Sequence, residues 1–132
     1  MSYLIDTDIV IYSLKGDERV IKNFHEHRNS PKSLSVITYG ELVYGAKKSK
    51  AVAKNLARAY RIAEVFPIID ITPAVVETFG AIKTALEQQG NIVADMDLLI
   101  AATALTHNLI LVTNNQKHFG RINGLDIENW AT

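Results

Sequence analysis

The sequence predicts an α/β protein in which helices cover both faces of a central, mainly parallel sheet. Short apolar runs at residues 3–5 and 109–112 have the composition of buried strands. Stretches with helical spacing of apolar residues separate these runs, and Gly and Pro residues mark their ends. Strands that alternate with helices pair in parallel through right-handed crossovers. We therefore predict a three-layer α/β/α sandwich around a sheet of about five strands.

The first strand, at residues 3–5, leads directly into a helix. Thr7 or Asp8 is expected to cap this helix, because side chains of both types accept hydrogen bonds from free backbone N–H groups. Gly16 is expected to end it. A second helix is predicted at residues 17–27, where apolar residues again recur at helical spacing.

A short strand at residues 33–36 begins the next unit. Thr38 and Glu41 follow it and fit the capping-box pattern, in which a glutamate in the first turn reaches back to the capping residue. Glu41 therefore has two interpretations, a helix cap or a catalytic acid, and its place just after a strand favours catalysis. The next strand is predicted at residues 66–71.

A basic stretch lies between these two strands. Six of the fourteen Lys and Arg residues fall between Lys47 and Arg61, with no acid among them. At helical spacing, Lys50, Lys54 and Arg58 line one face together with Arg61. Such a face can bind phosphates, but a solvated surface or a contact with a partner protein would explain it equally well.

The C-terminal half begins with the best-patterned helix of the chain. Thr72 and Pro73 supply its N-cap and first-turn proline, and Gly90 ends it. This helix is expected to serve packing alone. A second helix follows, with Asp95 as its expected N-cap, and runs to about His107.

Residues 109–112 form the clearest buried strand, and polar residues follow it at once. Among them, Thr113 and Asn115 can hydrogen-bond a metal-bound water or cap a short helix before Phe119. A final edge strand is predicted at residues 124–128. No internal repeat or linker interrupts the order of the elements.

Bulk properties narrow the class of protein. A chain of 132 residues is long enough for one domain with its own core, so residues 1–132 are taken as a single domain. No apolar run reaches the ~20 residues of a membrane span, and the N-terminus is not a signal peptide. The absence of Cys fits a cytoplasmic protein. Because the net charge is zero, any nucleic-acid partner must be recognised by local patches.

Three acids lie close to predicted strand–helix junctions. Asp6 and Glu41 come just after strands, and Asp97 lies in the first turn of a helix. In open α/β sheets, ligands bind where the strands deliver their C-terminal ends to helices, so we expect these acids to converge. Capping and the helix dipole alone would also account for Asp97, and Asp8 is interpreted as structural.

Grouped carboxylates raise one another's pKa values unless a cation neutralises them. A zinc site is not expected: the chain has no Cys, and His118 has no second His at ligand spacing, which places it on a helix surface. Oxygen ligands alone favour Mg²⁺ or Mn²⁺, and a metal-bound water can hydrolyse a phosphodiester. The sequence therefore predicts a metal-dependent nuclease with Asp6, Glu41 and Asp97 as metal ligands.

Four segments in this order also resemble a known family. They are residues 4–9, 41–46, 97–102 and 111–115, with Phe119 beyond. The chain resembles PIN-domain ribonucleases and, within them, the VapC-type toxins of toxin–antitoxin pairs. The resemblance spans nearly the whole chain, and although each motif alone is weak, four in order are specific.

The resemblance implies a PIN-like fold and RNA cleavage that depends on Mg²⁺ or Mn²⁺. By motif position, Asp6, Glu41 and Asp97 would be the core acids, and Thr113 would support Asn115 by hydrogen bonding. Asn115 stands where many members carry a fourth acid, so it could orient a water but supply no charge. The family also implies a homodimer inhibited by a cognate antitoxin whose C-terminal segment covers the pocket. Relatives with a similar Thr-Asn-Asn sequence cut the anticodon stem-loop of initiator tRNA, which makes tRNA a lead for the substrate.

Two other interpretations stay open at this point. In a haloacid-dehalogenase-like phosphatase, Asp6 would attack phosphorus and Asp8 would act as acid and base. Too few residues follow Thr113 for the lysine and acidic motif that such an enzyme needs downstream. In a non-catalytic PIN-like binding module, the acids would only cap helices, and Asn115 in place of an acid favours this possibility.

Overall fold

The computed structural model describes residues 1–132 and contains one five-stranded sheet in which all neighbouring strands are parallel. The strand order is β3-β2-β1-β4-β5. The strands are β1 (Tyr3–Ile5), β2 (Lys32–Ser35), β3 (Ile68–Ile69), β4 (Ile110–Val112) and β5 (Ile127–Glu128). The predicted parallel α/β sheet is confirmed, and β1 lies at its centre.

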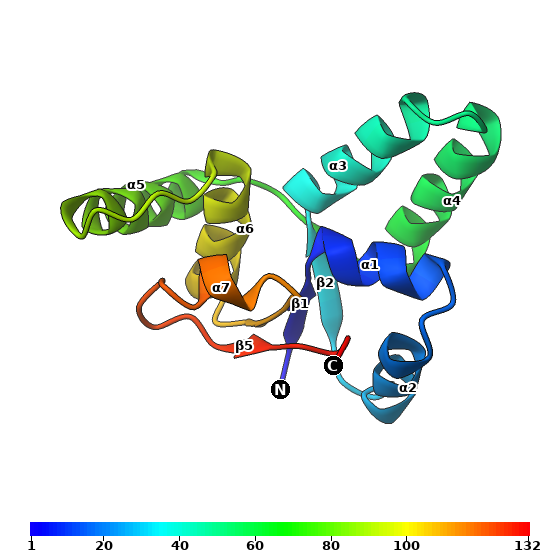
Figure 1. The fold of residues 1–132 in the computed structure, drawn as a ribbon, viewed down its shortest axis with the longest axis horizontal. Coiled ribbons are helices and arrows are strands. Elements are labelled where there is room, and N and C mark those ends of the chain that lie inside the picture. The colour runs from blue at the N-terminus through cyan, green and yellow to red at the C-terminus, as the bar shows by residue number, and fades with distance from the viewer.

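Helices cover both faces of this sheet. The helices are α1 (Thr7–Leu14), α2 (Glu18–Glu26), α3 (Val36–Lys47), α4 (Val52–Val65), α5 (Pro73–Gln88), α6 (Asp95–Thr106) and α7 (Gln116–Phe119). Figure 1 shows α1 to α4 on one side of the strands and α5 to α7 on the other. None of these helices is long and apolar enough to cross a membrane.

The central strand β1 supplies side chains to two separate hydrophobic clusters. Tyr3 and Ile5 join the cluster under α1 to α4, which also contains Trp130. Leu4 joins the cluster under α5 to α7 together with Phe119. Successive side chains of a strand point to opposite faces, so both faces of β1 are buried and only its end opens to a site.

The cap of α1 differs from the prediction. Asp6 is the N-cap, with an extended backbone, and its Oδ1 accepts a hydrogen bond from the Thr7 N–H (2.8 Å). Thr7 and Asp8 therefore lie inside the first turn, because the helix begins immediately after β1. Gly16 follows the end of α1 with a positive φ of 83°, which agrees with the prediction that it ends the helix.

The capping-box interpretation of Thr38 and Glu41, which was the alternative to a catalytic Glu41, is wrong. The cap of α3 is Ser35, whose side chain accepts a hydrogen bond from the Ile37 N–H (3.1 Å). Since Ser35 ends β2 and caps α3 at once, the helix begins earlier than predicted. Thr38 is consequently a buried residue of α3, and Glu41 lies about one helical turn further along the same helix.

Two further boundaries differ. The N-cap of α6 is Ala94 rather than Asp95, and the Asp95 carboxylate instead pairs with Lys83 of α5 (2.9 Å). The edge strands β3 and β5 fall within their predicted ranges but are shorter. An edge strand pairs on one side only, and Pro67 directly before β3 has no N–H to donate.

Candidate active site

The candidate site begins where the two central strands end. β1 and β4 pair in parallel with Ile5 opposite Val112, so the residues that follow them, Asp6 and Thr113, emerge side by side. The Thr113 hydroxyl donates to Asp6 Oδ2 at 2.7 Å, and both side chains are buried. The same hydroxyl accepts a hydrogen bond from the Asn115 N–H (3.0 Å), which is the support of Asn115 that the resemblance implies.

Asp6 is a buried carboxyl group, only 6% exposed. Its pKa is raised to about 7: burial is the largest cause and the neighbouring Asp8 adds to it, while the hydrogen bonds from Thr113 and Thr7 lower the pKa. Both carboxylate oxygens accept a hydrogen bond, yet the burial effect dominates. A cation beside Asp6 would favour its charged form.

Asp8 belongs to the same site, although the sequence suggested only a structural role. Its Oδ1 accepts from the Ile9 N–H (2.7 Å), and its Oδ2 accepts from the Asn114 N–H (3.1 Å). Burial raises the pKa of Asp8, and the negative charge of Asp97 adds to the increase. Asp97 acts on the pKa of Asp6 in the same direction, so the three aspartates lie close enough to repel one another.

Asp97 projects from the first turn of α6 and faces α7. Burial raises its pKa, and the positive charge of His118 on α7 opposes that increase. Asn115 Nδ2 lies 3.1 Å from His118 Nδ1, which joins Asn115 to the same corner of the site. His118 is half-buried on α7, near enough to Asp97 for its charge to act on that carboxyl group, and no feature of the local sequence reveals this proximity.

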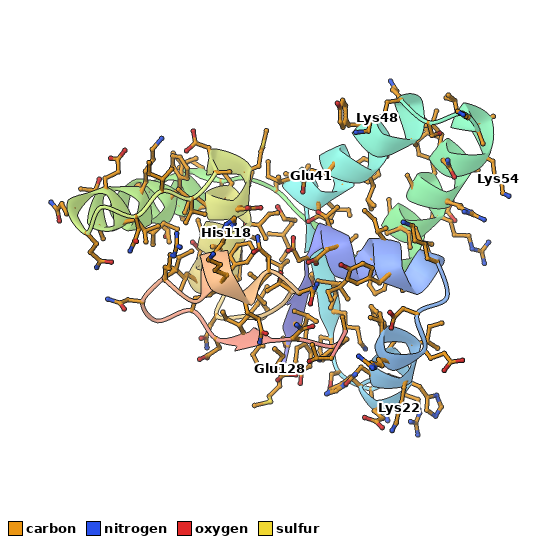
Figure 2. All side chains as sticks on the ribbon, in the orientation of Figure 1. Lys22, Glu41, Lys48, Lys54, His118 and Glu128 are labelled. Atoms are coloured by element: carbon orange, nitrogen blue, oxygen red, sulfur yellow. The ribbon has the colours of Figure 1, made fainter.

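Glu41 reaches the site from α3 through a hydroxyl group. Thr7 Oγ1 donates to Glu41 Oε1 at 2.6 Å and lies 3.1 Å from the hydroxyl of the buried Thr38. Thr7 is adjacent to Asp6 in the chain, so it connects Glu41 to the rim of the aspartate group. Figure 2 shows Glu41 on the α3 side of the strand ends and His118 on the α7 side.

The donor set of the site consists of oxygen atoms with one imidazole near by. No three Asp, Glu or His side chains lie close enough to hold one ion by themselves. Mg²⁺ commonly binds through one or two carboxylates and completes its shell with water. Asp6 and Asp97, both with raised pKa values, fit this mode, while Glu41 lies at the rim.

A groove of about 420 Å³ leads away from Glu41 between α1, α3 and α4. Its apolar lining includes Ile11 and Leu14 of α1 and Leu42 of α3, and Arg58 of α4 stands at its wall. The predicted basic face is exposed, with Lys54, Arg58 and Arg61 on α4 and Lys50 just before its first residue. Figure 2 shows Lys54 on the outer part of α4 and Lys48 near the outer end of α3. The groove and the basic face thus meet at Arg58.

Comparison with known families agrees with this geometry. The model of the PIN domain matches residues 3–125, a range that includes all of the site residues described above. The chain belongs to the PIN-domain family. The predicted PIN-like fold and the predicted family are both confirmed.

Relatives of this PIN domain align over nearly their full lengths. "Ribonuclease VapC2" of Haemophilus influenzae is 37% identical over 131 residues, which cover 99% of both chains. "tRNA(fMet)-specific endonuclease VapC" of Shigella flexneri is 31% identical over 131 residues, again 99% of both. The solved structure of VapBC2 from Rickettsia felis, bound to a promoter DNA fragment, has a TM-score of 0.92 at 36% identity and covers 98% of this chain and 99% of that chain.

These similarities decide between the interpretations that the sequence left open. The PIN domain is an endoribonuclease of the VapC type, as predicted, rather than a haloacid-dehalogenase-like phosphatase. Asp6 and Asp8 are then neighbouring acids of a nuclease site, and neither is needed as a covalent nucleophile.

Proposed function

We propose that this PIN domain hydrolyses RNA phosphodiesters with the help of Mg²⁺ or Mn²⁺, and that Asp6, Glu41 and Asp97 are its core acids. The observation that carries the proposal is the buried Asp6, whose pKa is raised to about 7 among two other aspartates. A group of acids that the fold holds together against their repulsion is suited to a cation.

A bound divalent ion would supply a water that is easier to deprotonate and would stabilise charge on the scissile phosphate. The protein's own residues orient this chemistry. Thr113 fixes the Asp6 carboxylate from the β4 side, and the Thr7 hydroxyl holds Glu41 at the rim. Asn115 can present its amide to a water or a phosphate oxygen, and its contact with His118 sets the direction of that amide.

Names of relatives suggest the substrate and the partners. Endonucleases specific for tRNA(fMet) from Shigella flexneri and Salmonella typhimurium are 31% and 34% identical to this chain. We therefore propose initiator tRNA in the cytoplasm as the target, with the exposed basic face of α4 near its backbone. VapBC structures from relatives support a cognate antitoxin, which would occupy the apolar groove beside Glu41. A homodimer is proposed from the family resemblance alone.

A cleavage assay on purified total tRNA tests the function directly. The wild type and Asp97→Asn are compared in Mg²⁺, in Mn²⁺ and in EDTA, with fragment ends mapped. The matched control is Asp95→Asn, because this nearby acid pairs with Lys83 outside the site.

We expect discrete cuts by the wild type and by Asp95→Asn in either metal, and none by Asp97→Asn or in EDTA. Cleavage that continues without metal, or unchanged activity of Asp97→Asn, would refute the metal role. If folded, antitoxin-free protein cuts neither tRNA nor a broader RNA pool, the non-catalytic binding module becomes the better explanation.

A further inference from the structure

Asn114 is the centre of a hydrogen-bond chain that the nuclease proposal does not use. Its Oδ1 accepts from Asn129 Nδ2 (2.9 Å), and its Nδ2 donates to the Tyr12 hydroxyl (3.2 Å). Its backbone N–H donates to Asp8 Oδ2 (3.1 Å). One residue of the loop after β4 thus connects the C-terminal segment to two side chains of α1.

The direction of this chain is fixed at its far end. Asn129 Oδ1 accepts from the Ala131 N–H (2.8 Å), which can only donate, so the Asn129 amide must turn its NH₂ group towards Asn114. Asn114 in turn presents its oxygen to Asn129 and its NH₂ group to Tyr12. The Tyr12 hydroxyl then accepts a hydrogen bond, and its own proton is directed to a group outside this chain of amides.

Tyr12 and Asp8 lie one turn apart on the same face of α1, so Asn114 contacts both at once. Asp8 is adjacent to Asp6 in the aspartate group. A movement of Asn114 would therefore displace a carboxylate of the site and a phenolic hydroxyl together.

The C-terminal segment is anchored by contacts that do not involve Asn129. Trp130 is 2% exposed and stacks on the His27 ring, with centroids 4.5 Å apart. Asn23 Nδ2 donates to the Trp130 carbonyl (3.3 Å), and the Glu128 carbonyl accepts from the Thr113 N–H (2.9 Å). Loss of the Asn129 side chain should therefore leave this segment in place.

We propose that Asn129 is a positioning residue of the nuclease site, which acts through Asn114 to hold the Asp8 carboxylate beside Asp6 and to turn the Tyr12 hydroxyl towards a phosphate oxygen of the RNA. The inference rests on the proposed RNA cleavage. It assigns a role in the site to a residue of the C-terminal segment, far from the acids in sequence.

The first test is steady-state cleavage of tRNA in Mg²⁺. Asn129→Ala should lower kcat about tenfold, the effect of one lost hydrogen bond at a reacting group, while KM changes less than about twofold. The control is Asn23→Ala, which removes a different bond to the same segment and should cleave like the wild type. In an Asn114→Ala background, Asn129→Ala should have no additional effect on kcat, because the side-chain hydrogen bonds from Asn129 through Asn114 to Tyr12 are already absent.

The second test is independent of catalysis. In ¹H–¹⁵N spectra of the metal-free protein, Asn129→Ala should move the signal of the Asn114 backbone amide proton upfield. The exchange rate of this proton with solvent should increase about tenfold. Asn129→Asp, which keeps the acceptor for Ala131 and removes the NH₂ donor, is the isosteric variant if Asn129→Ala folds poorly.

The outcomes separate the two proposals. An Asn114 amide that is unchanged in both variants would overturn the positioning role, and so would an equal loss of kcat in Asn23→Ala. An altered Asn114 amide in a protein that cleaves no RNA would support the positioning role and refute the nuclease. A fall in kcat together with an altered amide supports both.

Discussion

At the scale of single residues, burial outweighs hydrogen bonding at Asp6. Two donors, the Thr113 hydroxyl and the Thr7 N–H, favour the charged carboxylate, yet its pKa is raised from 3.8 to about 7. Burial also raises the pKa values of Asp8 and Asp97. The metal-free site is therefore most stable when these groups are protonated.

The stability of the metal-free protein should fall as the pH rises through the Asp6 titration. Between pH 3.8 and about 7, the folded state binds more protons at Asp6 than the unfolded chain does, so the free energy of unfolding decreases with pH. We expect the Tm measured in EDTA to decline across this window, and to decline less for Asp6→Asn. Addition of Mg²⁺ at pH 7 should raise the Tm of the wild type only. An identical pH dependence of Asp6→Asn and wild type would contradict the raised pKa.

The Thr113 hydroxyl serves two partners, since it donates to Asp6 and accepts from the Asn115 N–H (3.0 Å). Thr113→Val keeps the shape but leaves both partners without this bond in a buried place, so it should cost about 1–3 kcal/mol in urea unfolding. It should also slow tRNA cleavage. Thr113→Ser retains the hydroxyl and should remain close to wild type in both measurements. Equal losses in the two variants would point to packing of the methyl group instead.

At the scale of elements, the start of α3 determines where Glu41 lies. Ser35 ends β2 and caps α3, and this single residue sets the rotation at which Glu41 meets Thr7. The first turns of α3 consist almost entirely of apolar or neutral residues, so no periodic pattern marks where the helix begins. For the same reason the capping box at Thr38 stayed open as the alternative to a catalytic Glu41.

Removal of the α3 cap should therefore affect both stability and activity. Ser35→Ala should lower the free energy of unfolding by about 1 kcal/mol and should also reduce kcat, because Glu41 loses its fixed position. The control is Thr72→Ala at the cap of α5, whose Oγ1 accepts from the Val75 N–H (3.3 Å). It should cost a similar free energy and leave kcat unchanged. Equal kcat values in the two variants would show that the α3 cap does not position Glu41.

At the scale of the whole molecule, the sequence predicts those features that neighbouring residues determine. Strands, the glycine that ends α1, and the acids after β1 and in α6 are read from neighbouring residues. The approach of His118 to Asp97 and of Asn129 to Asn114 depends on how distant elements pack, so it has no local signal. The place of Asp8 in the aspartate group has no local signal either, because Asn114 and Asp97, which act on it, are far from it in the sequence.

The basic face of α4 is proposed to lie near the RNA backbone, and this proposal concerns the molecule as a whole. Substitution of Lys50, Lys54 and Arg58 by Gln should raise KM for tRNA and reduce the dependence of log KM on log salt by about 2, as ~0.7 per lost phosphate contact requires. Lys22→Gln on α2, which removes an exposed lysine that pairs with Glu26, is the control and should change neither. If KM stays constant while antitoxin binding weakens, the face is a protein interface.

The two shortest strands of the sheet are also its two borders. β3 and β5 each contain two residues, so each side of the sheet offers an added strand very few unpaired backbone groups. Copies of the protein therefore have almost no unpaired strand edge through which their sheets could join into fibrillar aggregates. We therefore expect a regulator of this protein to bind side chains on its helices rather than to add a strand to its sheet. Such side chains can differ from one protein pair to the next, whereas the backbone of a sheet edge is common to all such folds.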